Sequence, residues 1–278
     1  MKKFFILFLL LAVAGSAWAS NDWKTANTDN AWFTPTNWSG GVVPSRAVET
    51  NTRTYQTLFN TIVGGPVINS GAAESFQLEV GGSNDAVGPT KSIGTVTING
   101  GTLTTGSLDN LRGGYFRCGA SSTSNRWGAI YMNGGTVNVG GVEPFTVGWG
   151  STTLDVRGWL YMTAGTINVT NKFIIGNAAG ASGYADLDGG TIYAGDFQMK
   201  VTAGTGTVSL NMSGDAEIII TGDKTALVAQ YMDNGWINEE VLYDYDGRNP
   251  GKTTLYIPEP ATLCLLGFGA LSLLRRKR

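Results

Sequence analysis

Two aspartates separated by one residue are the arrangement in this chain closest to a catalytic pair. Asp186 and Asp188 fall on one predicted strand, where residues two apart point to the same side at about 6.5 to 7 Å. This separation lies in the range of the paired carboxylates of glycoside hydrolases. Asp188, however, aligns with turn residues and Asp186 with Thr and Tyr residues of other segments, so turn chemistry is the preferred interpretation. We therefore predict no catalytic residue.

The other residue types narrow the chemistry further. The chain has no histidine, which removes the Ser-His-Asp and Cys-His nucleophile systems and the most common zinc sites. Cys118 falls in an apolar pattern, where a buried small side chain is expected. The segment from Asp244 resembles the opening of a calcium loop but has Asn249 and Leu255 at the two positions that require Gly and Glu. We predict neither a metal ion nor a cofactor.

A polysaccharide lyase or glycoside hydrolase is the alternative function, because such enzymes work with carboxylates, Lys and Arg alone. Its mark would be a groove in which three or more acids, or acids with Lys and Arg, converge from adjacent segments. The candidates are Asp155, Arg157, Asp186 and Lys200, which are too widely spread in the sequence to indicate such a groove. The enzyme is therefore the less favoured interpretation.

Three short patterns recur in a fixed order through the middle of the chain, and their alternation of apolar residues predicts strands. The first pattern begins at Gly94, Gly128, Gly158, Gly183 and Gly206. The second is Gly-Thr-apolar at Gly101, Gly135, Gly165 and Gly190, with an early copy at Gly65 to Ile68 and a degenerate late copy at Asp215 to Ile220. The third is Phe, any residue, apolar, at Phe76, Phe116, Phe145, Phe173 and Phe197.

The fixed order predicts an all-β fold, a single-stranded parallel β-solenoid (β-helix) with one coil per unit. Strands of successive coils would lie about 4.8 Å apart. The dipeptides Asn99-Gly100, Asn133-Gly134 and Asp188-Gly189 are expected to supply the positive φ of the bend after the first pattern. Asn-Gly between alternating runs is also a hairpin signal, so an antiparallel β-sandwich is the alternative fold.

Stacked coils would bring equivalent side chains into columns. The predicted inward columns are Val96, Ile130, Leu160, Ala185 and Val208 in the first pattern, and Leu103, Val137, Ile167 and Ile192 in the second. The five phenylalanines would fill a corner between two faces. The predicted outward ladders of the second pattern are Thr102, Thr136, Thr166 and Thr191, with Thr104, Asn138, Asn168 and Tyr193 beside them.

Aromatic residues of the middle units form a candidate binding surface. Tyr131, Tyr161, Tyr193 and Trp159 are the candidate glycan contacts, because aromatic rings present flat, amphipathic area to sugars. The alternative is that these side chains cover loops and corners of the solenoid.

Segments outside the repeats are suited to covering the open ends of a solenoid. The tryptophans outside any repeat are Trp23, Trp32 and Trp38. At the other end we predict a helix at Thr225 to Asp233, followed by a strand pair at Val241 to Tyr245 and Thr253 to Ile257. The predicted divisions are a signal peptide at 1–19, an N-terminal cap at 20–53, solenoid repeats at 54–221, a C-terminal cap at 222–257 and a sorting signal at 258–278.

The N-terminus has the order of a secretory signal peptide. Lys2 and Lys3 precede an apolar run from Phe4 to Val13. Ala17 and Ala19 then stand at the two positions that a signal peptidase reads, with Ser20 following. The chain is predicted to be exported.

The C-terminus combines three features. The tripeptide Pro258-Glu259-Pro260 precedes an apolar run at 261–274, and the last four residues are Arg275, Arg276, Lys277 and Arg278. A helix over the run would be about 21 Å long, shorter than the roughly 30 Å hydrocarbon core, and so a marginal transmembrane anchor. The terminal cations stop transfer and keep this end inside, while the prolines keep the junction extended and accessible to a processing enzyme.

These three parts resemble the PEP-CTERM sorting domain, whose family tripeptide is matched by Pro258, Glu259 and Pro260. The resemblance implies cleavage by an exosortase-type enzyme in the inner membrane of Gram-negative bacteria that make extracellular polysaccharide. The body before the tail resembles β-helix, autotransporter-like repeats.

Charge and cysteine content describe the exported body. The ends hold six of the 19 basic residues, so residues 20–260 keep 13 basic against 21 acidic residues, a net charge near −8. This balance argues against nucleic acid as a partner, and one cysteine, Cys118, leaves no internal disulfide. We predict a non-enzymatic structural or adhesive protein of the cell surface or extracellular matrix. Its expected partners are signal peptidase, an exosortase-type enzyme and extracellular polysaccharide, with transient residence in the inner membrane; an uncut tail would leave it anchored there.

Overall fold

The computed structural model of the chain describes residues 20–23, 29–46, 51–54, 65–81, 92–106, 114–121, 126–150 and 155–258. Ala17 and Ala19 of the predicted signal peptide lie outside these residues. So do Glu259 and Pro260, the predicted transmembrane segment 261–274 and the four terminal cations. None of the helices in the described part of the chain is long and apolar enough to cross a membrane.

Strands of the first pattern form one parallel sheet, called here the first sheet. In order across the sheet its strands are β3 (Val67–Ile68), β6 (Ser92–Ile98), β9 (Arg126–Met132), β12 (Val156–Met162), β14 (Ala181–Leu187) and β16 (Val208–Met212). Neighbouring strands of this sheet come from successive repeats, because the chain forms strands of a second, larger sheet before it returns to the first sheet.

The other two faces belong to one larger sheet that bends between them. The second face holds β4 (Ala72–Ser75), β7 (Thr102–Thr105), β10 (Thr136–Val139), β17 (Glu217–Thr221) and the first halves of β13 (Thr166–Ile175) and β15 (Thr191–Met199). The third face holds β1 (Ser20–Asp22), β2 (Asn51–Thr54), β5 (Gln77–Val80), β8 (Phe116–Ser121), β11 (Phe145–Gly150) and the second halves of β13 and β15. The bend is marked by a register shift between Val169 and Lys172.

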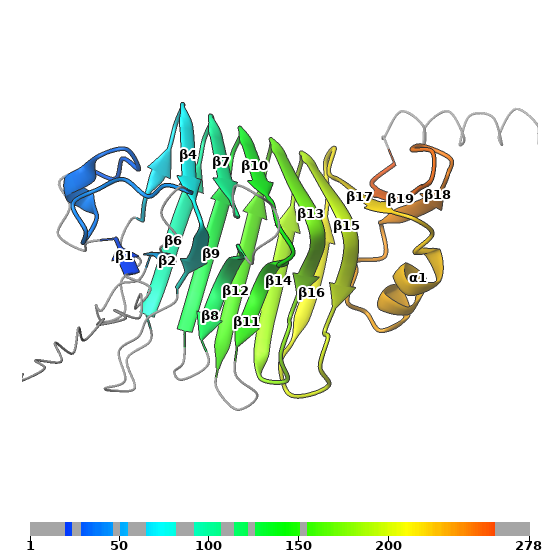
Figure 1. Cartoon of the computed structure of the whole chain (residues 1–278). Coiled ribbons are helices and arrows are strands. Elements are labelled where there is room, and N and C mark those ends of the chain that lie inside the picture. The colour runs from blue at the N-terminus through cyan, green and yellow to red at the C-terminus, as the bar shows by residue number, and fades with distance from the viewer. Residues whose placement is uncertain are drawn as a thin grey trace, which may run out of the picture.

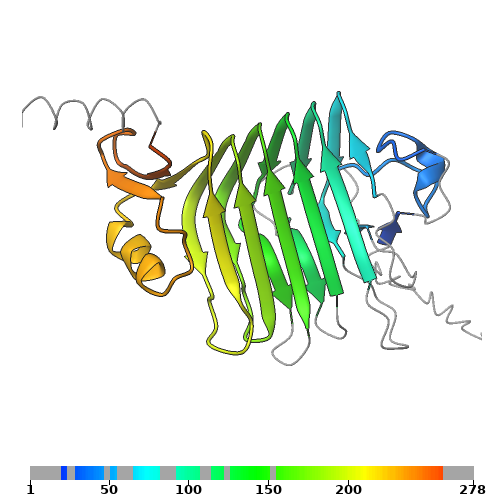
Figure 2. The same cartoon turned by 180° about the vertical axis from the view of Figure 1, so that it is seen from behind.

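The stacked strands run side by side along a single axis, as Figures 1 and 2 show from opposite sides. Every pairing between repeats is parallel, from β3 with β6 to β15 with β17. The predicted β-solenoid is therefore confirmed, and the antiparallel sandwich is wrong.

Columns of apolar side chains fill the interior. Leu103, Val137, Ile167 and Ile192 align in register and are almost fully buried, as predicted. In the first sheet the column continues through Leu210, which pairs with Ala185, and not through Val208. Val208 instead pairs with Gly183, so the last strand is displaced by two residues from the alignment of glycines that the sequence suggested.

Phenylalanines stack in the interior along the third face. Phe145 lies between Phe116 and Phe173, with ring centroids 4.8 and 5.3 Å away, and Phe197 extends the stack at 5.7 Å from Phe173. The predicted fifth member, Phe76, is out of register by two residues, because Leu78 is the partner of Phe116. The interior contact between distant segments that defines a solenoid is thus present in four successive coils.

Two sequence interpretations at the bends were wrong. The segment Gly65 to Ile68 is not an early second pattern, because Ile68 pairs with Ile98 in the first sheet. The following Asn69 then occupies the same place as Asn99 and joins the ladder as an acceptor, because the Asn99 side-chain amide donates to the Asn69 side-chain oxygen at 2.8 Å. The second pattern of that coil is β4, at Ala72–Ser75.

Positive φ falls one residue later than the Asn-Gly dipeptides predicted. The left-handed glycines are Gly101, Gly135, Gly165 and Gly190, with φ of 70°, 75°, 96° and 82°. A Cβ on Gly101 would lie 2.5 Å from the carbonyl oxygen of Gly71 in the preceding coil. Close stacking of coils, as well as the bend, therefore requires glycine there.

The third face meets the first sheet at a corner built from two columns of glycine. A Cβ on Gly158 of β12 would lie 2.4 Å from both the Cys118 carbonyl oxygen and the Gly148 amide nitrogen. Gly148 itself has φ of 80°. In the last coil Lys200, with φ of 49°, follows Met199 as Gly176 follows Ile175. At Gly158, backbone atoms of neighbouring segments approach so closely that a Cβ would clash with them.

Non-repeating segments lie at both ends of the stack (Figure 1). Trp23, Trp32 and Trp38 are buried and meet edge to face with centroids 5.0 Å apart around the short η1 helix (Pro35–Asn37). At the other end α1 (Thr225–Asp233) has the predicted bounds and packs Tyr231 against Phe197. The strands β18 (Leu242–Tyr245) and β19 (Lys252–Tyr256) pair antiparallel, and β19 also pairs antiparallel with β17.

Candidate functional site

The outward side of β9, β12 and β14 carries aromatic, hydroxyl and charged side chains, and it is called here the first outer face. Alternation along these strands turns apolar side chains inward and leaves Tyr131, Trp159, Tyr161 and Tyr184 half-buried on the outside. Three of the four predicted glycan contacts therefore come together. Tyr193 does not join them, because it lies on β15 in the second face, beside Asn168.

The aromatic rings of this face stack on one another from strand to strand. Tyr131 and Tyr161 have centroids 5.2 Å apart and planes inclined by 11°, and Trp159 and Tyr184 have centroids 5.6 Å apart and planes inclined by 16°. Rings stacked in this way turn their faces toward each other and their edges and hydroxyl groups toward solvent. The surface therefore offers aromatic edges and hydroxyls, not the open flat rings that the sequence suggested.

Burial and neighbouring negative groups alter the phenol of Tyr161. Partial burial, together with the proximity of Tyr131 and Asp186, raises the pKa of Tyr161 above its ordinary value. The group is therefore a neutral hydroxyl at physiological pH, able to donate and to accept a hydrogen bond.

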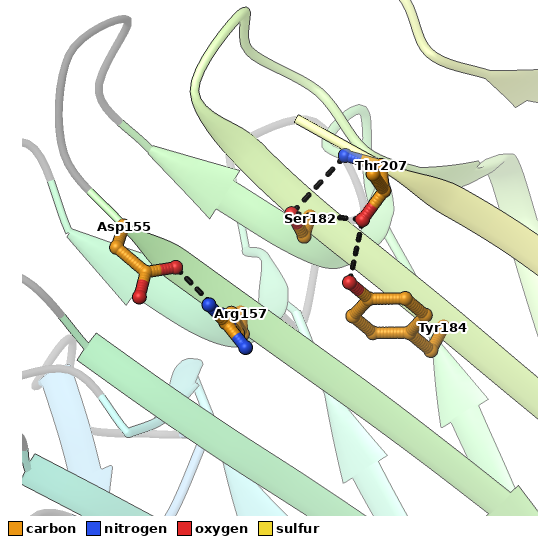
Figure 3. A network of polar contacts seen from close by, with 5 residues as sticks. All are labelled: Asp155, Arg157, Ser182, Tyr184 and Thr207. Atoms are coloured by element: carbon orange, nitrogen blue, oxygen red, sulfur yellow. Dashed lines mark hydrogen bonds and ion pairs between the residues drawn. The ribbon is translucent and has the colours of Figure 1, made fainter. Parts of the chain in front are cut away.

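Next to the aromatic residues the surface is hollowed over a volume of about 360 Å³. One wall carries Asp155 and Arg157, whose Oδ1 and Nε are 2.6 Å apart. The other wall carries Ser182, Tyr184 and Thr207, as Figure 3 shows. The Thr207 hydroxyl lies 2.5 Å from the Tyr184 hydroxyl and donates to the Ser182 hydroxyl at 3.3 Å. An ion pair thus faces a chain of hydroxyl groups across an open hollow.

Register explains how residues from separate coils meet here. Arg157 of β12 pairs with Ser182 of β14, so the two occupy one column. Asp155 precedes Arg157 by two residues. Thr207 directly precedes β16 and lies beside Ser182, whose hydroxyl accepts from the Thr207 backbone amide at 3.1 Å. Sequence reasoning named Asp155 and Arg157 only as scattered charges. Extending the column from Gly158 and Gly183 back by one residue would have placed Arg157 beside Ser182.

The two aspartates that were considered as a catalytic pair, Asp186 and Asp188, belong to ladders between coils. The amide of Asn211 donates to Asp186 at 2.7 Å, and the hydroxyl of Ser213 donates to Asp188 at 2.6 Å. Asp188 continues the bend column, in which the Asn133 amide donates to Asn99 at 2.9 Å. Both carboxylates therefore take part in the contacts that join one coil to the next.

The remaining charged candidates do not gather around this pair. Lys200 lies near Trp236, its ammonium 5.9 Å from the ring centroid. In the part of the chain that the structure describes, no group of three or more Asp, Glu, Cys or His side chains is placed to hold a metal ion.

Cys118 lies inside the solenoid. Burial raises the pKa of its thiol to about 12, although hydrogen bonds with the backbone, first that of Trp159, act to lower it. The thiol donates to the Trp159 carbonyl oxygen at 3.3 Å. It is therefore protonated and enclosed at neutral pH, as expected of an apolar core residue.

At the far end of the solenoid, Pro258 borders a second hollow of about 370 Å³ with Glu217 and Arg248. The Arg248 guanidinium lies 3.0 Å from Glu217 and 3.7 Å above the Tyr256 ring. The first proline of the tripeptide therefore follows directly from folded structure, two residues after the end of β19.

Residues 257–278 match the family model of the PEP-CTERM protein-sorting motif. The motif indicates an exported protein that is held transiently at the membrane and processed by an exosortase-type system. The fold and the motif together define the class: a parallel β-solenoid that carries a C-terminal sorting signal. The chain matches no curated protein and no solved structure.

Proposed function

We propose that this protein is a structural or adhesive element of the cell surface or extracellular matrix, and that it associates there with the polysaccharide of the producing cell. The stacked coils support a structural role, because each coil is joined to the next by backbone pairing and by side-chain ladders. The sorting motif supports delivery to the outside. Signal peptidase at Ala17, Ala19 and Ser20 and an exosortase-type enzyme at the tripeptide are the processing partners.

The observation that carries the polysaccharide contact is the first outer face. It brings Tyr131, Tyr161 and Trp159 together with the hydroxyl groups and the ion pair of the adjacent hollow. Amphipathic aromatic edges beside convergent hydrogen-bonding groups are the usual features of a site for a small polar ligand. The face spans three successive coils, so it offers a polymer more than one point of contact.

Retention on immobilised polysaccharide from the producing cells tests this proposal. The exported protein is expected to bind, and the double variant Tyr131→Ala/Tyr161→Ala is expected to bind more weakly, because it removes the stacked pair. Tyr193→Ala is the matched control, since Tyr193 is exposed at 39% but lies on the second face. No retention, or equal retention of the double variant, would dispose of the proposal.

We further propose that the protein does not cleave the polymer that it binds. Support comes from Asp186 and Asp188, each engaged by a neighbouring coil, and from the enclosed thiol of Cys118. Incubation of the purified protein with the same polysaccharide is expected to leave its chain length unchanged. New reducing ends or unsaturated products would instead establish the lyase or hydrolase.

The location depends on whether the tail is cut. Mass spectrometry of the protein recovered outside the cell is expected to find a C-terminus near Pro258. Recovery only from the inner membrane, with Arg278 retained, would indicate an anchored module.

A further inference from the structure

We propose that the hollow beside Arg157 is the sugar-binding subsite of the first outer face, and that it takes an uncharged sugar ring through two neighbouring hydroxyl groups. This inference rests on the proposed function, because it names the residues and the class of polysaccharide for the same contact. It shifts the centre of binding from the stacked tyrosines to the polar hollow.

The shape of the hollow fits one or two sugar rings. Its volume of about 360 Å³ lies at the lower end of the range for small-molecule sites. The two walls come from adjacent coils, and Arg157 and Asp155 are partly exposed to solvent, so a ring that remains part of a polymer can reach the hollow. The Trp159 and Tyr184 stack borders it, which places an apolar edge beside the polar groups.

The ion pair is arranged to recognise a diol. A carboxylate accepts hydrogen bonds and a guanidinium donates them, so one hydroxyl can donate to Asp155 while its neighbour accepts from Arg157. The pair uses Nε of Arg157, at 2.6 Å from Asp155, and a guanidinium carries four further N–H groups on its two terminal nitrogens. Neither side chain is deeply buried, with exposures of 40% for Arg157 and 37% for Asp155. Both are therefore reachable from solvent.

Arg157 is also held in position by a ring on the neighbouring strand β9, where Trp127 is its register partner. Its guanidinium lies 4.9 Å from the Trp127 ring centroid, and Trp127 in turn meets Trp159 edge to face at 5.9 Å. The hydrogen bond that Arg157 donates to Asp155 raises the pKa of Arg157 above its ordinary value. A preorganised donor loses little freedom when it binds.

The opposite wall supplies uncharged hydroxyl groups. Each hydroxyl of Ser182, Tyr184 and Thr207 can both donate and accept, and the three form a chain joined by Thr207. Such a chain can reverse its direction to suit either orientation of a sugar hydroxyl. The two walls together therefore match several hydroxyl groups around one ring.

Charge decides between neutral and acidic sugars. Asp155 neutralises the charge of Arg157. The carboxylate of a uronate would be attracted by the Arg157 guanidinium and repelled by the adjacent Asp155 carboxylate. The body around the site carries a net charge near −8, with 13 basic against 21 acidic residues at 20–260. An acidic polymer would be repelled at long range as well. A neutral sugar meets neither obstacle.

Titration of the exported protein with neutral galactomannan and with acidic polygalacturonate, followed by affinity electrophoresis, tests this inference. We expect binding to galactomannan that falls about tenfold in Asp155→Ala and in Arg157→Ala, as loss of one or two hydrogen bonds to a charged group implies. The double variant should bind no worse than the weaker single variant, since the two residues act as one unit. Arg248→Ala is the matched control, because Arg248 also pairs with an acid and covers a ring, but at the far end.

The outcomes separate the subsite from the proposed function. Unchanged galactomannan binding in Arg157→Ala, with loss in Tyr131→Ala/Tyr161→Ala, would overturn the subsite and leave the polysaccharide contact standing. Stronger binding of polygalacturonate, lost in Arg157→Ala, would overturn the neutral class. Binding of neither polymer nor of the producer's own polysaccharide would overturn both. Matching melting curves for each variant establish that lost binding is not lost folding.

Discussion

Two aromatic stacks of nearly the same spacing run along this solenoid, one inside and one outside. Phe116, Phe145 and Phe173 stack in the interior at 4.8 and 5.3 Å, and Tyr131 stacks on Tyr161 at 5.2 Å on the first outer face. The repeat fixes the spacing in both cases, since paired strands lie about 4.8 Å apart. The stacks differ in the sheet that carries them and in the side of the strand to which the rings point. The inner stack should therefore determine stability, and the outer stack should determine what the surface contacts.

The largest effect is expected from the inner stack. Phe145→Ala removes a fully buried ring between two others, and it should lower the free energy of unfolding by about 3 to 5 kcal/mol. Chemical denaturation of the exported protein measures this value. Phe33→Ala is a suitable control, because Phe33 is exposed at 43% and lies outside the repeats. Equal effects of the two substitutions would contradict the assigned interior.

The corner between the third face and the first sheet should be the next most sensitive place. Gly158→Ala adds a Cβ 2.4 Å from backbone atoms of Cys118 and Gly148, and forcing these apart should cost about 1 to 3 kcal/mol. Gly41→Ala is a less suitable control, because Gly41 has a positive φ that would itself strain an alanine. The control is Ala216→Gly, which exchanges the same two residue types at a buried position outside any helix. A Gly158→Ala protein as stable as the parent would show that the coils approach less closely here.

The interior position of Cys118 predicts a dependence of stability on pH. Its pKa is raised to about 12 in the folded protein, whereas an unfolded thiol ionises near pH 8.5. The unfolded state therefore binds fewer protons between these pH values, and stability should fall there with a slope of up to about 1.4 kcal/mol per pH unit.

Measuring the free energy of unfolding against pH for both the parent and Cys118→Ala distinguishes the contribution of this thiol from that of other groups that titrate in the same range. The parent should lose stability more steeply than the variant as the pH rises above about 8.5. Parallel curves for the two proteins would place the thiol in contact with solvent.

The smallest effect on stability is expected from the outer stack. Tyr161→Ala removes a half-buried ring and should cost about 0.5 to 1.5 kcal/mol beyond its lost burial. Its effect on polysaccharide retention should be larger than its effect on unfolding. A Tyr161→Ala protein as unstable as Phe145→Ala would remove the distinction between the two stacks.

Much of the fold could be predicted because the repeated patterns, once aligned, show which residues of successive strands are partners. The second-pattern columns and the ladder of Thr102, Thr136, Thr166 and Thr191 follow directly from alignment of Gly-Thr segments. Prediction failed at the first and last coils, where Leu78 and Leu210 replace the expected members. On the outer side, Leu78 lies next to β2 and Leu210 lies next to Ile237, and these neighbours belong to segments that do not follow the three patterns. The repeat therefore supplies no register for these positions.

The candidate site was harder to predict for a different reason. Alternation showed which side Trp159, Tyr131 and Tyr161 face, but it could not show that their rings stack face to face. The ring planes depend on side-chain rotation, which the period of two leaves open. The hollow was missed because the sequence aligned Gly206 with Gly183, whereas Val208 is the partner of Gly183. The observed register places Thr207, directly before β16, beside Ser182.

Cross-linking of paired threonines tests the stacking of coils most directly. Thr136 and Thr166 are partners in adjacent parallel strands, so Thr136→Cys/Thr166→Cys should form a disulfide on mild oxidation, since paired Cα atoms about 4.8 Å apart suit one. Thr136→Cys/Thr191→Cys lies two coils apart and should not. Peptide mapping by mass spectrometry reads both results. A disulfide in the second variant and none in the first would contradict the parallel, in-register solenoid.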